Sequence, residues 1–196
     1  MDKATEFVKR RKSKIMKATG IVRRIDDLGR IVIPKEIRRT LRIRESDPLE
    51  IYTDREGQVI LKKYSPIGEM TTFARQYAES LAQVSGHIAL ISDRDQFIAT
   101  AGGGKGYMGK EVSKQLEEKM NERETGVCSQ GDRNFFRVCD DQEGEYQHMA
   151  FTPIICEGDV IGSVILLDND YKGKMGEVEY KLIMSAAGFL GRQMEQ

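Results

Sequence analysis

Apolar side chains in residues 17–63 occur in short runs of β-branched residues, which is typical of a small β-rich unit. Residues 21–25 and 31–33 form two such runs, and a turn-forming stretch that ends at Gly29 separates them. Gly29 is free to adopt the positive φ that a tight turn requires. Asp26 and Asp27 lie in this turn, and we expect them to shape it rather than to contact a ligand.

A short helix and two further strands complete this stretch. Pro34 ends the second β run and suits the first turn of a helix, so we predict a helix at residues 36–41. Residues 49–53 and 58–62 are again β-prone, and a turn at 54–57 joins them. The predicted order is strand, strand, helix, strand, strand.

A unit of this size seldom buries enough apolar surface to fold alone unless disulfides, metals or a second subunit help it. Residues 17–63 contain neither Cys nor His, so a second copy of the chain remains. Exchange of a hairpin between two copies would pool their Ile, Val and Leu side chains into one core. It would also pair the cationic clusters in a way that suits a two-fold symmetric DNA site; these clusters comprise Arg23, Arg24, Arg30, Arg38 and Arg39.

The chain then changes character. Ser65, Pro66 and Gly68 mark residues 64–68 as a linker. Apolar side chains at steps of three or four predict an amphipathic helix over residues 69–84; they are Met70, Phe73, Tyr77, Leu81 and Val84. We expect this helix to pack on the following domain. It could also serve as a dimerisation helix that transmits a conformational change between the domains, and the two roles are compatible.

The remaining pattern predicts a central antiparallel sheet with helices at both ends of the domain. Strands are expected at 87–92 and 96–100, joined by a turn at 93–95, and a helix at 108–122. Residues 126–146 are polar and irregular, with 135–138 as their one strand-like run.

A further antiparallel series follows at residues 148–152, 153–156 and 160–167, with a hairpin turn at 157–159. Residues 176–193 form the last predicted helix. Its inward side chains are expected to be Leu182, Ile183, Ala186, Phe189 and Leu190.

Charge is divided unevenly along the chain. The total is 31 basic and 31 acidic residues, but residues 1–63 hold 18 basic and 10 acidic ones, a net of +8, and the rest carries −8. This asymmetry indicates a polyanion-binding part joined to a part of a different kind. No apolar run approaches 18 residues and no signal-peptide pattern opens the chain, so we expect a soluble cytoplasmic protein. The basic residues 1–15 are expected to be a flexible tail, or to precede Met16 as the usual start.

Catalytic chemistry finds little support. The glycine-rich residues 102–106 fail the phosphate-loop pattern, because Ala99 replaces its first Gly and Gly106 its Ser/Thr, so we expect a flexible connection. His87 and His148 have no nucleophile or metal-ligand partner at motif spacing.

Three cysteines, at 128, 139 and 156, lack metal-site spacing, and a redox role for the first two is the weaker alternative to inert thiols. We expect no catalytic residues, no metal, no cofactor and no enzyme activity.

Four short sequence segments resemble the AbrB-type swapped-hairpin DNA-binding family of bacterial transition-state regulators. They are TGIVRRIDDLGRIVIP (19–34), EIRRTL (36–41), PLEIY (48–52) and ILKKY (60–64). The resemblance implies an α+β protein whose N-terminal domain is a dimeric swapped-hairpin β-barrel. It implies that arginines at four matching positions approach double-stranded DNA; they are Arg23, Arg30, Arg38 and Arg39. Lys17 and Arg24 are expected as secondary contacts.

The words MGEVE (175–179) and AAGFLGRQMEQ (186–196) extend the resemblance to the stage V sporulation protein T family, with a GAF-like C-terminal α/β sensor domain. The expected domains are then 16–64 for DNA binding and dimerisation, 65–84 for linker and helix, and 85–196 for the GAF-like part. The resemblance implies an activator and repressor of late, forespore-stage genes. It also implies a homotetramer formed through the C-terminal domain and an unknown small ligand under lid segments 102–108 and 126–146.

A second hypothesis remains open at this point. Swapped-hairpin domains also occur in antitoxins, so the chain could be an antitoxin-like or scaffold protein that uses this fold mainly to dimerise. Antitoxins carry a short disordered toxin-binding tail, whereas this chain continues into a patterned domain. That continuation favours the regulator.

Overall fold

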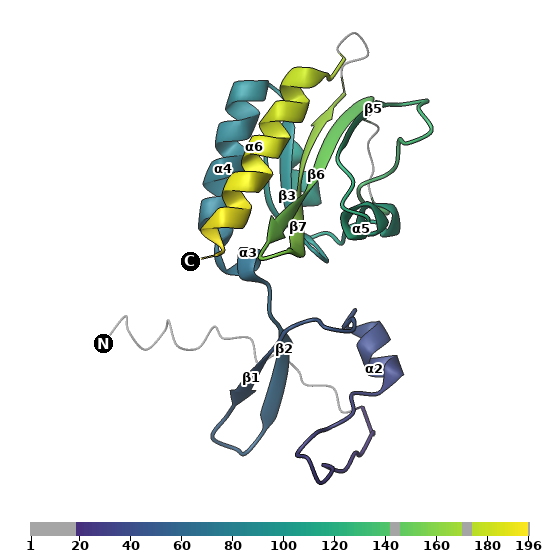
Figure 1. Ribbon diagram of the computed structural model, residues 1–196, viewed down its shortest axis with the longest axis vertical. Helices are drawn as coiled ribbons and strands as arrows, with labels where there is room; N and C mark the ends of the chain where they lie inside the picture. The colour runs from purple at the N-terminus through teal and green to yellow at the C-terminus, as the bar shows by residue number, and fades with distance from the viewer. Residues whose placement is uncertain (1–18, 142–145, 170–173, 196) are drawn as a thin grey trace, which may run out of the picture. The chain divides into compact units, whose positions relative to one another are not determined.

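The computed structural model describes residues 19–141, 146–169 and 174–195 (Figure 1). The predicted N-terminal tail and Lys17 therefore lie outside the described residues. Internal contacts divide the chain into two units, residues 1–44 and residues 45–196, and each is described by itself. None of the described helices is long and apolar enough to span a membrane.

The first unit contains the predicted turn and the predicted helix, α2 (Lys35–Thr40). The strands predicted at 21–25 and 31–33 are not formed in the single chain, so that prediction is wrong for an isolated copy. The physical reason is visible in the exposure of their side chains, which reaches 88% at Val22 and 70% at Val32. A two-stranded ribbon with neither face covered is marginal in water, and the described part of the chain leaves these side chains exposed.

The second unit begins with a hairpin of β1 (Leu49–Thr53) and β2 (Val59–Lys63), as predicted. The strands pair antiparallel from Leu49 opposite Lys63 to Thr53 opposite Val59. Asp54 forms the turn, because its Oδ1 accepts hydrogen bonds from the backbone N–H groups of Glu56 and Gln58, both at 2.9 Å. Gly57 completes it at φ +80°. The hairpin is thus fixed locally, by turn chemistry and register.

A five-stranded antiparallel sheet in the order β4-β3-β7-β6-β5 forms the centre of the C-terminal part. Its strands are β3 (Ile88–Asp93), β4 (Phe97–Ala101), β5 (Gly126–Ser129), β6 (His148–Cys156) and β7 (Asp159–Asp168). Residues 148–156, which we predicted as two strands, form one continuous strand with an irregularity between Ile154 and Ile155. The turn that follows has positive φ at both Glu157 and Gly158, as a tight hairpin turn requires.

Helices cover both faces of this sheet (Figure 1). On one face lie α4 (Thr71–Ser85) and α6 (Glu177–Gln193), and on the other lies α5 (Lys114–Asn121). The short helix α3 (Pro66–Glu69) falls in the segment predicted as a linker, and its Ile67 is fully buried in the core beneath α4 and α6. The predicted central antiparallel sheet with helices at both ends of the domain is confirmed.

Two predictions on the α5 side were wrong. The helix expected at 108–122 begins only after its N-cap Ser113, whose Oγ accepts from the Leu116 N–H at 3.0 Å. The preceding residues pair with β4 instead, through Phe97 N–H to Lys110 O at 3.0 Å. Strand β5 was not predicted, because residues 126–129 are short and weakly apolar. Residues 135–138 form no strand, but Phe136 and Val138 are buried.

Small residues bring the two long helices close to the sheet. In α4 the buried residues are Ala74, Ala78 and Leu81, while Phe73 and Tyr77 are only partly buried. In α6 the predicted inward residues Ile183, Ala186 and Leu190 are buried, but Phe189 is 37% exposed. The inward face is therefore the face with the smallest side chains, and the bulkier aromatic side chains lie beside it.

Gly191 tests this close approach. A Cβ at this position would collide with the backbone carbonyl of Ile155, so Gly191→Ala is expected to lower the free energy of unfolding by about 1–3 kcal/mol. Gly188 lies on the same helix with only the flexible Arg192 side chain near, at 3.8 Å. Gly188→Ala is therefore the matched control and should raise stability by up to ~1 kcal/mol. Denaturant unfolding of both variants measures the difference, and equal effects would contradict close packing at Gly191.

Candidate nucleic-acid interface

The turn at residues 26–29 is organised by one carboxylate. Asp26 Oδ1 accepts from the backbone N–H groups of Leu28 at 3.1 Å and Arg30 at 2.8 Å. Its Oδ2 accepts from Arg30 Nε at 2.8 Å, and Gly29 adopts φ +75° as predicted. The backbone hydrogen bond from Arg30, followed by the one from its side chain, lowers the pKa of Asp26. Asp26 thus shapes the turn, as expected from sequence, and it also holds Arg30, which the sequence did not predict.

This arrangement leaves most of Arg30 available. Its side chain is 68% exposed, and the pair with Asp26 uses Nε but neither terminal nitrogen. A guanidinium held in this way presents its terminal N–H groups in a fixed orientation, which suits two-point contact with a phosphate or a guanine edge. The turn therefore holds one exposed cation in place.

Helix α2 places two further arginines. Arg38 and Arg39 lie in its last turn and are exposed, and Glu36 lies in its first turn. Cations at a helix C-terminus and an anion at its N-terminus both interact favourably with the helix dipole, so this charge order stabilises a helix of only six residues. Arg23 and Arg24 are exposed in the segment before the turn. Five of the six predicted DNA contacts therefore lie exposed in the first unit, and Lys17 is outside the described residues.

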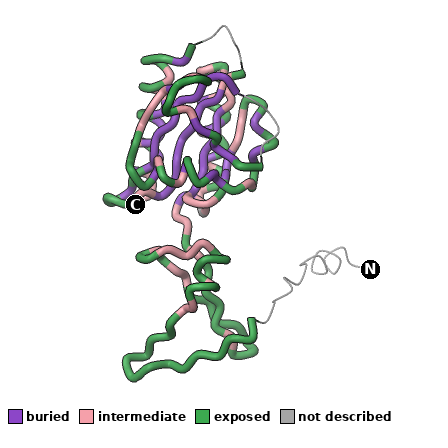
Figure 2. The backbone as a smooth tube through the Cα atoms, turned by 90° about the vertical axis from the view of Figure 1, so that its right-hand side faces the viewer, coloured by how far each residue is buried: buried purple, intermediate pink, exposed green. Residues whose placement is uncertain are grey.

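Exposed apolar side chains concentrate in the same part of the chain. Of the twenty large apolar side chains exposed among the described residues, thirteen belong to residues 21–64. Figure 2 shows the same contrast, with exposed backbone through these residues and a buried interior in the C-terminal domain. Unpaired apolar surface of this extent marks an interaction surface.

The two histidines have structural partners, as predicted. His87 precedes β3 and lies between two carboxylates, with Nδ1 3.4 Å from Asp168 Oδ2 and Nε2 3.6 Å from Glu179 Oε1. His148 begins β6, and its Nδ1 lies 2.8 Å from Ser129 Oγ. Among the described residues no group of three His, Cys, Asp or Glu side chains is arranged to hold a metal ion.

The cysteines are free and buried. Burial, followed by the charge of Asp132, raises the pKa of Cys128 to about 12, so its thiolate is scarcely populated at neutral pH. Burial raises the pKa of Cys156 as well. These environments are those of inert thiols and give the redox hypothesis no support.

The space between the sheet and α5 is filled by side chains. Leu116, Phe136 and Phe151 are buried there, and Phe136 packs edge-on against Phe151 at 5.0 Å between ring centroids. Tyr146 is tied into this core, because its hydroxyl donates to Phe136 O at 2.6 Å and accepts from Val138 N–H at 2.9 Å. An open hollow of about 330 Å³ lies at the strand ends beside His87 and Asp168, and Gly102 and Gly103 of the first predicted lid segment line it.

Comparison with known proteins decides the family. Residues 69–195 match a family described as the C-terminal domain of stage V sporulation protein T, a transcription factor. The chain is 53% identical to stage V sporulation protein T of Bacillus subtilis over 182 residues, which cover 92% of this chain and all of that protein. The chain belongs to the stage V sporulation protein T family.

Other matches agree with a two-part member of the stage V sporulation protein T family. The transition state regulatory protein AbrB of Bacillus subtilis is 48% identical over 101 residues, covering 52% of this chain and 85% of that protein. Residues 22–69 also match a family described as the bacterial antitoxin MazE. The GAF domain of an Acinetobacter phosphoenolpyruvate-protein phosphotransferase is similar in structure, with a TM-score of 0.54 and 10% identity over 64% of this chain and 81% of that one. The last match shows the fold alone and confirms the predicted GAF-like domain.

Glu179 provides a test of the polar contacts around His87. Burial favours a raised pKa, but hydrogen bonds, chiefly from the Gly176 N–H at 2.6 Å, lower the pKa of Glu179 overall. Because the folded pKa is depressed, the carboxylate stabilises the fold above the unfolded value of about 4.5, and this contribution is lost as pH falls through the folded pKa. Glu179→Gln should therefore cost about 0.5–1 kcal/mol at pH 7, as for a lost cap, and less below pH ~4. Urea unfolding at several pH values measures this, and a cost independent of pH would contradict it.

Proposed function

We propose that this protein is a DNA-binding transcription regulator of late, forespore-stage sporulation genes that acts both as activator and as repressor. Its N-terminal domains dimerise on double-stranded DNA, and its C-terminal domains join two such dimers into a tetramer. In this proposal the protein works in the cytoplasm, on the nucleoid. Membership of a sporulation transcription-factor family supports the general role, and the site described above supports the mode of action.

One observation carries the DNA-binding proposal: an exposed arginine is fixed by a carboxylate within a turn, on a unit with four more exposed arginines. The contact residues are Arg23, Arg30, Arg38 and Arg39, with Arg24 and Lys17 as secondary contacts. The similarity of residues in this part to a transition state regulator supports the same interpretation. Guanidinium groups both position a protein on phosphates and read base edges, so these residues serve affinity and sequence preference together.

The tetramer proposal rests on the outer surface of α4 and α6. Phe189 stacks on Tyr77 at 5.5 Å between ring centroids and contacts Phe73 at 5.8 Å. Val84 of α4 and Val178 of α6 are further exposed apolar side chains of these two helices. Two copies that pair through this surface would bury it as a four-helix arrangement.

The antitoxin hypothesis has one supporting observation, the match of residues 22–69 to an antitoxin family. That match covers the swapped-hairpin part, which regulators and antitoxins share. Residues 69–195 match a transcription-factor domain and form a sheet with its own core, and this continuation favours the regulator.

Small-ligand sensing is the least supported part of the proposal. A ligand between the sheet and α5 would have to displace buried aromatic side chains such as Phe136 and Tyr146. It would shift regulation only by binding two arrangements of the domain with different affinity. Thermal shift of the full chain with cellular metabolites tests for such a ligand.

Arg30→Ala tests the DNA site. We expect a loss of about 1–3 kcal/mol in DNA binding if Arg30 reads a base, or a salt-dependence slope lowered by about 1 if it contacts phosphate alone. Fluorescence anisotropy with labelled duplexes over a salt series measures both. Arg75→Ala is the matched control, because Arg75 is an exposed arginine on α4 in the other unit.

The duplexes for this measurement come from genome-wide occupancy of the native protein. Recovered fragments that share a motif and bind with a steep salt slope would support the regulator. Absence of enrichment, together with retained dimerisation and an Arg30→Ala variant that binds as the native chain does, would favour the interaction-protein hypothesis.

Phe189→Glu tests the tetramer. A charge placed among Phe73, Tyr77 and their counterparts should convert tetramers into dimers without unfolding the domain, because Phe189 lies at the surface. Light scattering after size-exclusion chromatography measures the mass. Met108→Glu is the control, since Met108 is 52% exposed outside these helices. A tetramer that persists in Phe189→Glu would exclude this surface as the contact.

A further inference from the structure

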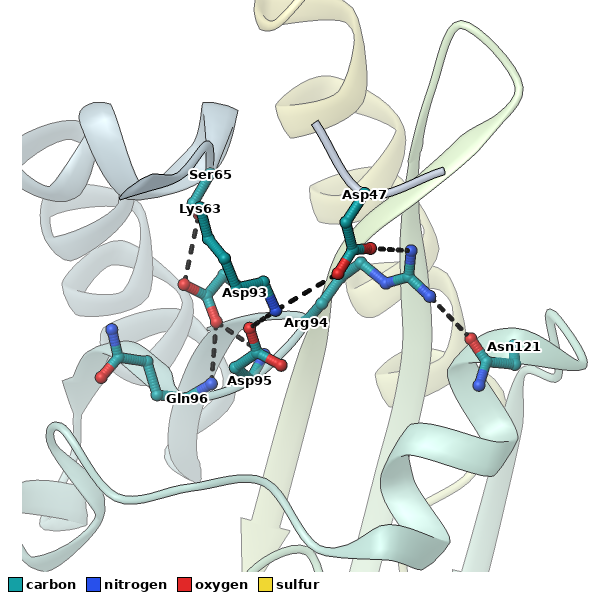
Figure 3. A network of polar contacts seen from close by, with 8 residues as sticks. All are labelled: Asp47, Lys63, Ser65, Asp93, Arg94, Asp95, Gln96 and Asn121. Atoms are coloured by element: carbon teal, nitrogen blue, oxygen red, sulfur yellow. Dashed lines mark hydrogen bonds and ion pairs between the residues drawn. The ribbon is translucent and has the colours of Figure 1, made fainter. Parts of the chain in front are cut away.

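The turn between β3 and β4 carries a carboxylate that organises it. Asp93 is 7% exposed, and its Oδ1 accepts from the backbone N–H groups of Asp95 and Gln96, both at 2.7 Å. Its Oδ2 accepts from Ser65 Oγ at 3.2 Å. The turn is therefore rigid, and it presents Arg94 and Asp95 in a set orientation toward the base of the β1–β2 hairpin, which lies in the same unit of the chain (Figure 3).

Lys63, the last residue of β2, contacts this turn. Its Nζ forms an ion pair with Asp95 Oδ2 and lies 3.5 Å from Asp47 Oδ2. Asp47 lies before β1, and its side chain is only 4% exposed. The side chains of Lys63 and Asp95 are 24% and 27% exposed, so these pairs are partly shielded from water. One lysine thus joins both chain segments at the open end of the hairpin to the C-terminal domain.

Arg94 makes a parallel connection. Its Nη1 lies 3.5 Å from Asp47 Oδ1, and its Nη2 donates to Asn121 Oδ1 at the end of α5 at 3.0 Å (Figure 3). Asp47 is therefore bound by two cations, one from β2 and one from the β3–β4 turn. Removing one of two cationic partners from a buried carboxylate leaves part of its charge uncompensated, which destabilises the folded state. Each of these contacts therefore depends on the other.

The chain that leaves the hairpin is fixed at the same place. Ser65 accepts from Gly68 N–H at 3.1 Å as the N-cap of α3 and also donates to Asp93. Ile67, two residues later, is fully buried in the core. Every second residue from 63 to 67 thus contacts the C-terminal domain. Lys63 does so by an ion pair, Ser65 by a hydrogen bond and Ile67 by apolar burial.

We propose that Asp47, Lys63, Arg94 and Asp95 form a clamp that positions the hairpin for DNA recognition, and that Lys63 serves this clamp instead of contacting DNA. The inference rests on the proposed function and deepens it. If two DNA-binding dimers are joined in one tetramer, the second dimer binds at an effective concentration set by how closely its position is restricted. A clamped hairpin restricts that position, whereas a released one adds an ordering cost to binding at two sites.

The test compares two duplexes: a genomic fragment with two copies of the recovered motif, and the same fragment with one copy scrambled. Lys63→Gln should weaken binding of the full chain to the two-site duplex by about tenfold, as expected for release of an interaction of one to two kcal/mol. It should leave one-site binding and the salt slope unchanged. Lys62→Gln is the matched control, because Lys62 is the exposed neighbour of Lys63 on β2 and no ion pair of the clamp includes it.

A double-mutant cycle with Asp95→Asn tests the pair itself. If Lys63 acts through Asp95, the double variant should bind the two-site duplex nearly as either single variant does. Lys63→Arg, which keeps the charge, should restore most of the loss. Thermal unfolding of each variant shows whether the C-terminal domain stays folded.

Two results would overturn the clamp. Unchanged binding of Lys63→Gln to the two-site duplex would show that the hairpin needs no such restraint. A salt slope lowered by about 1, with equal losses on both duplexes, would make Lys63 a phosphate contact. In either case Arg30→Ala would still weaken binding if the proposed function holds, so failure of the clamp and failure of the function are distinguishable.

Discussion

The fold of residues 19–64 depends on apolar side chains that one chain cannot bury. Val22 and Val32 are among the most exposed residues of the first unit, and Ile51 and Val59 remain exposed on the hairpin. Each such side chain forgoes about 1.5–3 kcal/mol that its burial would supply. A second copy can supply that burial and also pair the open strand edges. The arginines lie on the same segments and are already exposed in one chain, so such pairing would bring two copies of them onto one assembly.

In the C-terminal domain, by contrast, the apolar side chains are buried within one chain, because helices cover both faces of its sheet. Alanines and glycines let α4 and α6 lie close to the strands, as the tight contact of Gly191 with Ile155 illustrates. Larger aromatic side chains would not fit beneath these helices, so Phe73, Tyr77 and Phe189 lie at their outer margin. On the opposite face, bulky residues fill the interior. The fold is GAF-like. Its interior on the α5 side is filled by side chains, whereas the outer surface of α4 and α6 exposes apolar side chains.

Much of this architecture was predictable because local chemistry determines it. Turns at Gly29 and Gly57, the helix at α2 and the hairpin at β1–β2 follow from turn residues and alternation, and all are present. The strands at 21–25 and 31–33 were not formed, because their pairing depends on a partner chain and not on local sequence.

Hydrophobic periodicity also failed to predict which face of a helix packs against the sheet. Phe189 was expected inside, because apolar spacing counts a large aromatic residue and an alanine alike. In the structure Ala186 and Ala187 face the sheet and Phe189 does not, because small side chains allow the helix to lie close to the strands. No sequence motif predicted the pairing of Arg30 with Asp26. None predicted the contacts of Lys63 either, because they join Lys63 to Asp47 and Asp95, which are distant in the sequence.

The same contacts change how the charge of this protein should be interpreted. Residues 1–63 carry a net charge of +8, and a count of this kind treats every basic residue as part of the electrostatic footprint. Lys63, which is part of this count, is held by carboxylates within its own unit at 24% exposure, and so is Arg94, which lies outside the count, at 34%. Arg30, by contrast, is 68% exposed beside Asp26. In the proposed function and clamp, cations of the first kind position the hairpin, and those of the second kind attract and contact the duplex. Salt therefore acts on the two groups differently, since partly buried pairs are screened much less than exposed charges. Moderate ionic strength therefore weakens the attraction of exposed cations such as Arg30 more than it weakens the partly buried pairs of Lys63.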